Sequence, residues 1–226
     1  MMSMMKGTAM RDHDSVLQQI RVGRVVAIVR LRQEAPLVRV AEALVEGGIM
    51  ALEFTLTSPG AVAAIAQARA HFGEDVIVGA GTVLDAAEAR RCLDAGAQFL
   101  VSPGFDRAVV VAARDAGALA LPGALTPTEI VTAWRAGADV VKVFPARTFG
   151  PRYIADLLAP LPGIPLMPTG GVDETNVAAY LGAGAVGVAV GGRLVAEDAV
   201  GRADWDALTE RARVLVAAIR PAIDGV

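Results

Sequence analysis

The stretch DVVKVFP, Asp139 to Pro145, has the composition of a strand that is covered on both faces. Valine and phenylalanine favour strands, and a nearly unbroken apolar run is typical of a parallel strand in an α/β fold. Proline cannot continue a central strand, so we expect this strand to end at Phe144. Lys142 therefore lies near the carboxyl end of the strand, where the active sites of α/β folds are found.

Lys142 is the residue of this strand that burial does not explain. A buried, unpaired ammonium is costly, so such a lysine finds a partner or loses its proton. A neutral amine in an apolar pocket is a nucleophile toward carbonyl groups. The chain contains only one other lysine, Lys6, and arginine cannot supply a nucleophilic amine. We expect a chemical role for Lys142; the alternative is a side chain that extends to water from the strand end.

Short apolar runs recur along the chain, and alanine-rich segments with helical spacing separate them. The intervals leave room for one strand, one helix and two short loops. Eight such units predict a (β/α)8 TIM barrel. A doubly wound open sheet is the alternative, but no Gly-x-Gly-x-x-Gly turn follows the first strand. The predicted strands are 25–29, 51–56, 76–80, 99–101, 118–121, 140–144, 166–167 and 185–190.

The predicted helices begin and end at recognisable signals. Asp85, Asp106 and the pair Thr126 and Glu129 are N-terminal caps, and Ala-Gly-Ala triplets supply a glycine where helices end. We predict one domain, a barrel over residues 13–226 with an extra N-terminal helix at 14–22 that closes its floor. Residues 1–12 are expected to form a disordered or flexible tail. The other predicted helices are 36–45, 60–70, 86–95, 107–116, 128–136, 151–158, 176–181 and 205–219.

Composition argues against several classes of protein. The formal net charge is -3 and no basic run is present, so we expect no nucleic-acid partner. No apolar segment approaches the roughly 20 residues of a membrane span. The single cysteine, Cys92, cannot form an internal disulfide, which is typical of cytoplasmic proteins. The spacing of histidines, cysteine and carboxylates resembles no metal site, and we expect no metal or cofactor.

Other polar side chains are expected at the carboxyl rim beside Lys142. In the strand from Ala51, alternation places Glu53 on the inner face, opposite to Leu52 and Phe54. Glu53 is a candidate general acid/base; alternatively, it is a structural ion-pair partner of Arg30 or Lys142.

Two more positions complete this rim. Arg30 ends the first predicted strand, and Thr82 follows the third. Gly79 and Gly81, just before Thr82, would let a ligand approach the backbone.

Glycine pairs follow the seventh and eighth predicted strands. These places match the usual phosphate site of barrel enzymes, where backbone N–H groups and a helix N-terminus bind the anion. The alternative is that both pairs serve only tight turns. The candidate phosphate-binding residues are Thr169, Gly170, Gly171, Gly191, Gly192 and Arg193.

Five segments follow one another along the chain: LEFTL at 52–56, GAGTV at 79–83, VSPG at 101–104, VKVFPA at 141–146 and PTGG at 168–171. Together they resemble the class I 2-keto-3-deoxy-6-phosphogluconate (KDPG) / 4-hydroxy-2-oxoglutarate aldolase family. The resemblance extends from about Val25 to Val195.

The resemblance implies a (β/α)8 barrel that forms a homotrimer and acts on a small keto acid. It implies a Schiff-base lysine at Lys142 and an acid/base glutamate at Glu53. It places Thr82 against the substrate carboxylate, and Thr169 with the following glycine pair around the substrate. Phe144 is expected to form a wall of the site.

The chain departs from the family pattern at Thr57, where the best-known members have an arginine that binds the keto-acid carboxylate. We expect Arg30 to supply this charge, as in the branch that acts on the galactonate epimer. The segment 149–154 also resembles that branch, whereas Thr169 matches the gluconate branch. Arg193 stands where a serine is usual.

The predicted function is a metal-independent class I aldolase. It cleaves KDPG or 4-hydroxy-2-oxoglutarate to pyruvate and an aldehyde, which is glyceraldehyde 3-phosphate or glyoxylate. The alternatives are an aldolase for the galactonate epimer, a phosphosugar isomerase or epimerase with Glu53 as base, and a barrel that binds a metabolite without catalysis.

Overall fold

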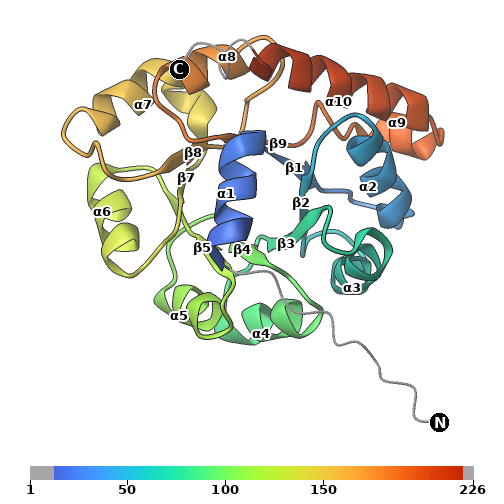
Figure 1. Cartoon of the computed structure of the whole chain (residues 1–226), viewed down its shortest axis with the longest axis horizontal. Coiled ribbons are helices and arrows are strands. Elements are labelled where there is room, and N and C mark those ends of the chain that lie inside the picture. Colours follow the sequence, from blue (N-terminus) through green and yellow to red (C-terminus); the bar gives the residue numbers. More distant parts are fainter. Residues whose placement is uncertain (1–12, 221–226) are drawn as a thin grey trace.

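Parallel strands occupy the centre of the molecule and helices surround them (Figure 1). The computed structural model describes residues 13–220, so the tail predicted for residues 1–12 lies outside the described residues. The strands are β1 (Val25–Val29), β2 (Ala51–Thr55), β3 (Ile77–Gly81), β4 (Phe99–Val101), β5 (Leu119–Leu121), β6 (Gly123–Ala124), β7 (Val141–Val143), β8 (Leu166–Pro168) and β9 (Val188–Val190).

The helices alternate with the strands along the chain, so the fold is α/β, as the repeating pattern predicts. A single 3₁₀ turn (Ala146–Thr148) follows β7. The helices are α1 (His13–Gly23), α2 (Leu37–Glu46), α3 (Ala61–Phe72), α4 (Ala86–Asp94), α5 (Arg107–Asp115), α6 (Pro127–Arg135), α7 (Gly150–Leu158), α8 (Val177–Gly182), α9 (Glu197–Gly201) and α10 (Trp205–Ile219). Within residues 13–220, no helix is both long and apolar enough to cross a membrane.

The predicted helix caps are confirmed. The carboxylates of Asp85 and Asp106 each accept hydrogen bonds from two backbone N–H groups of the first helical turn. Thr126 and Glu129 form a capping box at the start of α6. These contacts satisfy N–H groups that have no partner inside a helix, and so they determine where α4, α5 and α6 begin.

The strands form two parallel sheets, with the orders β5-β4-β3-β2-β1-β9 and β6-β7-β8. The predicted fifth strand, 118–121, agrees with β5 and ends before Pro122, which has no N–H for the ladder. Beyond Pro122 the chain forms β6, which was not predicted. At the other junction, the Val186 N–H donates to the Leu166 carbonyl at 3.0 Å, and Thr169 forms a bridge with Ala189. The smaller sheet is therefore joined to the larger one at both edges: the chain links β5 to β6 through Pro122, and backbone contacts link β8 to the segment that contains β9.

Alternation along the strands separates two apolar clusters. One cluster lies between the strands and the helices and includes Leu52 and Phe54. The other lies on the inner face of the strands and includes Ile28 and Val140. Side chains of α1 belong to the inner cluster, since Val16 and Ile20 are buried within it. At the carboxyl ends of the strands, the residues on this inner face are polar, Glu53 two residues after Ala51 and Lys142 two residues after Val140, and they define the site.

Candidate active site

A cavity of about 350 Å³ lies at the carboxyl end of β7, next to the Lys142 side chain. Lys142 shares the inner face with Val140, as the alternation predicts, and is only 3% exposed. Its Nζ atom lies 5.0 Å from the centre of the Phe144 ring, so Phe144 forms a wall beside the amine. The lining residues are Arg30, Leu31, Arg32, Thr57, Thr82, Pro103, Lys142 and Phe144.

Glu53 extends from β2 into the same interior and is fully buried. Neither oxygen of its carboxylate has a hydrogen-bond partner within residues 13–220. Burial raises the pKa of Glu53, and the charges of Lys142 and Arg30 oppose that shift. An acid with an elevated pKa and two unsatisfied oxygens can both give and accept a proton.

The pKa of Lys142 moves in the opposite direction. Burial lowers the pKa of Lys142; the Glu53 carboxylate raises it and Arg30 lowers it again. Desolvation is the largest cause for both residues, so burial shifts the amine and the acid each toward its neutral form. A neutral amine beside a protonated acid is the combination that attack on a carbonyl requires.

The glycines of β3 make room for side chains rather than for a ligand, so this expectation was wrong. A Cβ atom on Gly81 would overlap the Glu53 carboxylate, and one on Gly79 would lie 2.5 Å from the Phe99 ring. Glu53 pairs with Gly79 in the sheet register, and Thr55 pairs with Gly81. The two glycines therefore let the interior hold Phe99 and a buried carboxylate side by side.

Thr82 lines the Lys142 cavity directly after β3. Its φ angle is 59°, in the left-handed region that β-branched residues seldom adopt. Such strain is characteristic of ligand-binding positions.

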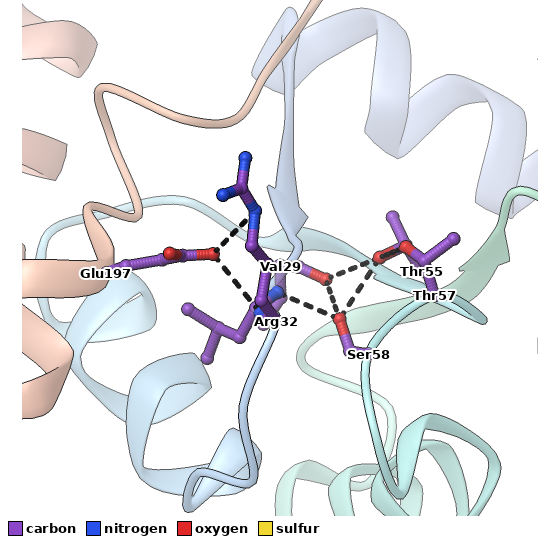
Figure 2. A network of polar contacts seen from close by, with 7 residues as sticks. Val29, Arg32, Thr55, Thr57, Ser58 and Glu197 are labelled. Carbon is purple, nitrogen blue, oxygen red and sulfur yellow. Dashed lines mark hydrogen bonds and ion pairs between the residues drawn. The ribbon is translucent and has the colours of Figure 1, made fainter.

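Arg30 lies between two cavities, because it lines both the Lys142 cavity and the larger groove next to it. Hydroxyl groups from β2 and its loop hold the peptide groups on either side of it (Figure 2). The Thr55 hydroxyl donates to the Val29 carbonyl at 3.2 Å, and the Leu31 N–H donates to the Ser58 hydroxyl at 3.0 Å. These contacts fix the backbone at Arg30.

Thr57, where the family pattern has arginine, belongs to the same hydroxyl network. Its hydroxyl lies 3.1 Å from that of Thr55, and its side chain lines the Lys142 cavity. Thr57 is therefore close to the amine but carries no charge.

The larger groove has a volume of about 640 Å³ and extends outward from Arg30 and Phe144. Both predicted glycine pairs, Gly170 with Gly171 and Gly191 with Gly192, line this groove, so the structure brings them together. Sequence reasoning missed Arg32, Arg147, Asp173 and Glu197, since nothing in their local pattern marks them. The lining residues among the predicted set are Thr169, Gly170, Gly171, Gly191, Gly192 and Arg193.

The chain matches known proteins over most of its length. Residues 16–211 match the sequence model of the family described as "KDPG and KHG aldolase". The 2-dehydro-3-deoxy-phosphogluconate aldolase of Treponema pallidum is 37% identical over 194 residues, which cover 85% of this chain and 90% of that protein. The chain belongs to the KDPG and KHG aldolase family.

Two further members of this aldolase family bear on substrate and chemistry. The probable 2-dehydro-3-deoxy-6-phosphogalactonate aldolase of Rhizobium meliloti is 38% identical over 160 residues, covering 70% of this chain and 76% of that protein. The KDPG aldolase of Legionella pneumophila is 27% identical, with a TM-score of 0.79 over 91% of this chain and 98% of that chain. Its structure holds pyruvate as a covalent carbinolamine intermediate.

Proposed function

We propose that this member of the aldolase family is a class I aldolase that cleaves a 2-keto-4-hydroxy acid through an imine on Lys142. The observation that carries the proposal is the burial of Lys142 and Glu53 in one interior, 3% and 0% exposed, where both groups shift toward their neutral forms. The carbinolamine of the Legionella pneumophila relative supports the same chemistry.

Imine formation uses both groups. The neutral amine of Lys142 attacks the C2 ketone, and a proton passes from nitrogen to the new alkoxide to give a carbinolamine. Glu53 in its acid form then protonates the C2 hydroxyl, which leaves as water. The products of this step are a protonated imine on Lys142 and a Glu53 carboxylate, each next to an opposite charge.

Cleavage uses the charge so created. The Glu53 carboxylate takes the proton of the C4 hydroxyl, the C3–C4 electron pair moves into the protonated imine, and an aldehyde leaves. Glu53, now protonated, gives a proton to C3 of the enamine that remains, which regenerates a protonated imine. Water then adds at C2, and loss of the Lys142 amine releases pyruvate. The protonated imine is the electron sink, which supports our proposal that the reaction needs no metal ion.

The remaining predicted residues have binding roles in this proposal. Arg30 and Thr82 hold the C1 carboxylate, because both line the lysine cavity and a guanidinium can bind a carboxylate through two hydrogen bonds. Phe144 is the wall beside C2. The backbone at Thr169, Gly170, Gly171, Gly191 and Gly192 surrounds the distal end of the substrate.

The natural substrate in this proposal is one of three compounds: KDPG, its galactonate epimer or 4-hydroxy-2-oxoglutarate. The names of the relatives include both sugar-acid series, and Thr57 and Arg30 support the galactonate branch. Turnover of the three compounds side by side tests this choice.

We also propose that the two sheets form one closed (β/α)8 barrel with α1 across its floor. The support is the short break at Pro122, the bridge between Thr169 and Ala189, and the packing of Val16 and Ile20 against the inner cluster. A homotrimer and a cytoplasmic location complete the proposal. Light scattering would detect the trimer as a species of three times 23.3 kDa.

Trapping tests the imine. Pyruvate with borohydride should add one pyruvate-derived mass to the peptide that carries Lys142, and Lys142→Arg should abolish trapping and turnover, because it keeps the charge without the nucleophile. A phosphosugar isomerase would leave no reduced adduct. Label on Lys6 instead, or an active arginine variant, would end the proposal.

A further inference from the structure

Four guanidinium groups surround the groove next to the lysine cavity, and they differ in their partners. The four arginines are Arg30, Arg32, Arg147 and Arg193. Two of them pair with carboxylates that line the same groove. Arg193 contacts Asp173 at 2.9 Å, and Arg32 lies 3.8 Å from Glu197, which also accepts the Arg32 backbone N–H.

These two carboxylates offset the charges of Arg193 and Arg32. Asp173 is 14% exposed and accepts hydrogen bonds from the Thr175 backbone and hydroxyl, which with Arg193 lower the pKa of Asp173. A substrate anion that approached Arg193 would therefore also meet a fixed negative charge. The same reasoning applies to Arg32 beside Glu197.

Arg147 is the opposite case. Within residues 13–220, no carboxylate forms an ion pair with Arg147 or with Arg30. The Arg147 N–H donates to the Gly170 carbonyl at 2.9 Å, which fixes its backbone to the glycine loop. Its side-chain stem lies over Gly171, where a Cβ atom would have the Cγ and Cδ atoms of Arg147 at 3.2 Å.

The two unpaired cations thus line different parts of one continuous site. Arg30 and Phe144 line both cavities, whereas Arg147 lines only the outer groove. With C2 at Lys142 and the C1 carboxylate at Arg30, the distal end of an extended substrate points into the groove. An anion there meets the guanidinium of Arg147 without a competing carboxylate.

We propose that Arg147 determines specificity for substrates whose distal end carries a phosphate. This inference rests on the proposed function, since it assumes that Lys142 holds C2. A phosphate offers the oxygens that a planar guanidinium binds through two hydrogen bonds, and its charge is retained throughout the reaction. A hydroxyl at the same distal carbon offers neither.

The test uses the phosphorylated 2-keto-3-deoxy acid that wild type cleaves faster, the gluconate or the galactonate epimer, and compares it with its unphosphorylated counterpart in wild type and Arg147→Gln. The variant should lose about 10- to 100-fold in kcat/KM for the phosphorylated acid, as expected for a hydrogen-bonded charge pair. For the unphosphorylated acid it should stay within about twofold, as for an exposed surface change. Arg147→Lys should recover part of the preference, because it restores the charge but not the two parallel hydrogen bonds.

Arg152→Gln is the matched control, since Arg152 lies on α7, is exposed and pairs with Asp156 outside the groove. It should change neither value. Equal losses on both acids in Arg147→Gln, or no loss on the phosphorylated acid, would overturn the role of Arg147. Pyruvate trapping on Lys142 separates the two proposals: it persists in Arg147→Gln if only the specificity inference fails, and it is absent from wild type if the imine itself fails.

Discussion

At the scale of single residues, the proposed site contains two ionisable groups, Glu53 and Lys142, that share a buried interior. Burial moves the pKa of Glu53 up and that of Lys142 down, and the charge of Arg30 lowers both. Each neighbour therefore shifts the pKa of Lys142 in a definite direction: Glu53 raises it and Arg30 lowers it. Removing a negative neighbour lowers the pKa of an amine, and removing a positive neighbour raises it.

The pH dependence of imine formation by Lys142 should show the direction in which each neighbour shifts its pKa. The rate of trapping with pyruvate rises with pH as the amine loses its proton, so the position of this acid limb reports the pKa of Lys142. We expect Glu53→Gln to move the limb to lower pH and Arg30→Gln to move it to higher pH, whatever happens to the maximal rate. If the acid limbs of the two variants moved in the same direction, the charges of Glu53 and Arg30 would not set the pKa of Lys142.

Gly81 provides a second test at this scale, because the Glu53 carboxylate occupies the space of a Cβ atom there. Gly81→Ala should displace the carboxylate and lower kcat by about 10² to 10⁴, the usual contribution of general acid–base catalysis. Glu53→Gln should cost a similar factor, and the double variant little more, since both remove one function.

Gly163→Ala is the matched control, because the space around that glycine is open. It should leave kcat unchanged. Full activity in Gly81→Ala would show that the Glu53 carboxylate can move without consequence for the reaction.

At the scale of elements, the loops after β1 and β2 are joined by buried hydroxyl groups (Figure 2). Ser58 is 3% exposed and Thr55 is fully buried, and together they bind the Val29 carbonyl and the Leu31 N–H. Arg30 lies between these two peptide groups, so its direction depends on an adjacent strand rather than on its own side-chain contacts. In our proposal, the charge missing at Thr57 is replaced by Arg30, whose flanking peptide groups are held by this strand and its loop.

Ser58→Ala should therefore act through Arg30. We expect KM for keto acids to rise by about 2- to 10-fold, the range of one net hydrogen bond, with kcat little changed. Arg30→Ala should raise KM about 10- to 100-fold, as for a hydrogen bond to a charged group. Ser58→Ala should add little in the Arg30→Ala background.

Thr209→Val is the control for the removal of a buried hydroxyl group in Ser58→Ala. Thr209 is also a buried hydroxyl that donates to a carbonyl, that of Ala43 at 3.0 Å, but it lies between α10 and α2. It should lower stability without affecting KM. Additive effects of Ser58→Ala and Arg30→Ala would mean that Ser58 supports the fold and not the arginine.

At the scale of the whole molecule, the last helix of the described residues packs on the first helix after β1. Figure 1 shows α10 next to α2. Gly47, which ends α2, has no room for a side chain: a Cβ atom would overlap Ala212 of α10. The end of α2 and the helix α10, which are distant in sequence, thus pack with their backbones in close contact.

Gly47→Ala should consequently destabilise the protein by about 1–3 kcal/mol, as overpacking does. Thermal unfolding should show a lower Tm, with trapping on Lys142 unchanged in the folded fraction. Gly182→Ala in α8 is the matched control: its surroundings are open, and alanine favours a helix over glycine. A Tm for Gly47→Ala equal to that of Gly182→Ala would contradict the close contact.

The sequence by itself determined the order of strands and helices, the helix caps and the inward direction of Lys142 and Glu53. These features follow from local periods and from side chains that bind their own backbone, so they can be read without distant contacts. The strand β6 was not predicted, because its two residues, Gly123 and Ala124, carry no strand pattern of their own.

Only the tertiary structure decided which distant side chains share space. Gly79 and Gly81 make room for Phe99 and Glu53, Ser58 holds the backbone at Arg30, and Asp173 neutralises Arg193 whereas Arg147 lacks such a partner. Each of these facts joins residues from different strand–helix units. A single sequence records the type of each residue but not which residues meet across the interior, so packing and charge pairing emerge only when the chain is folded.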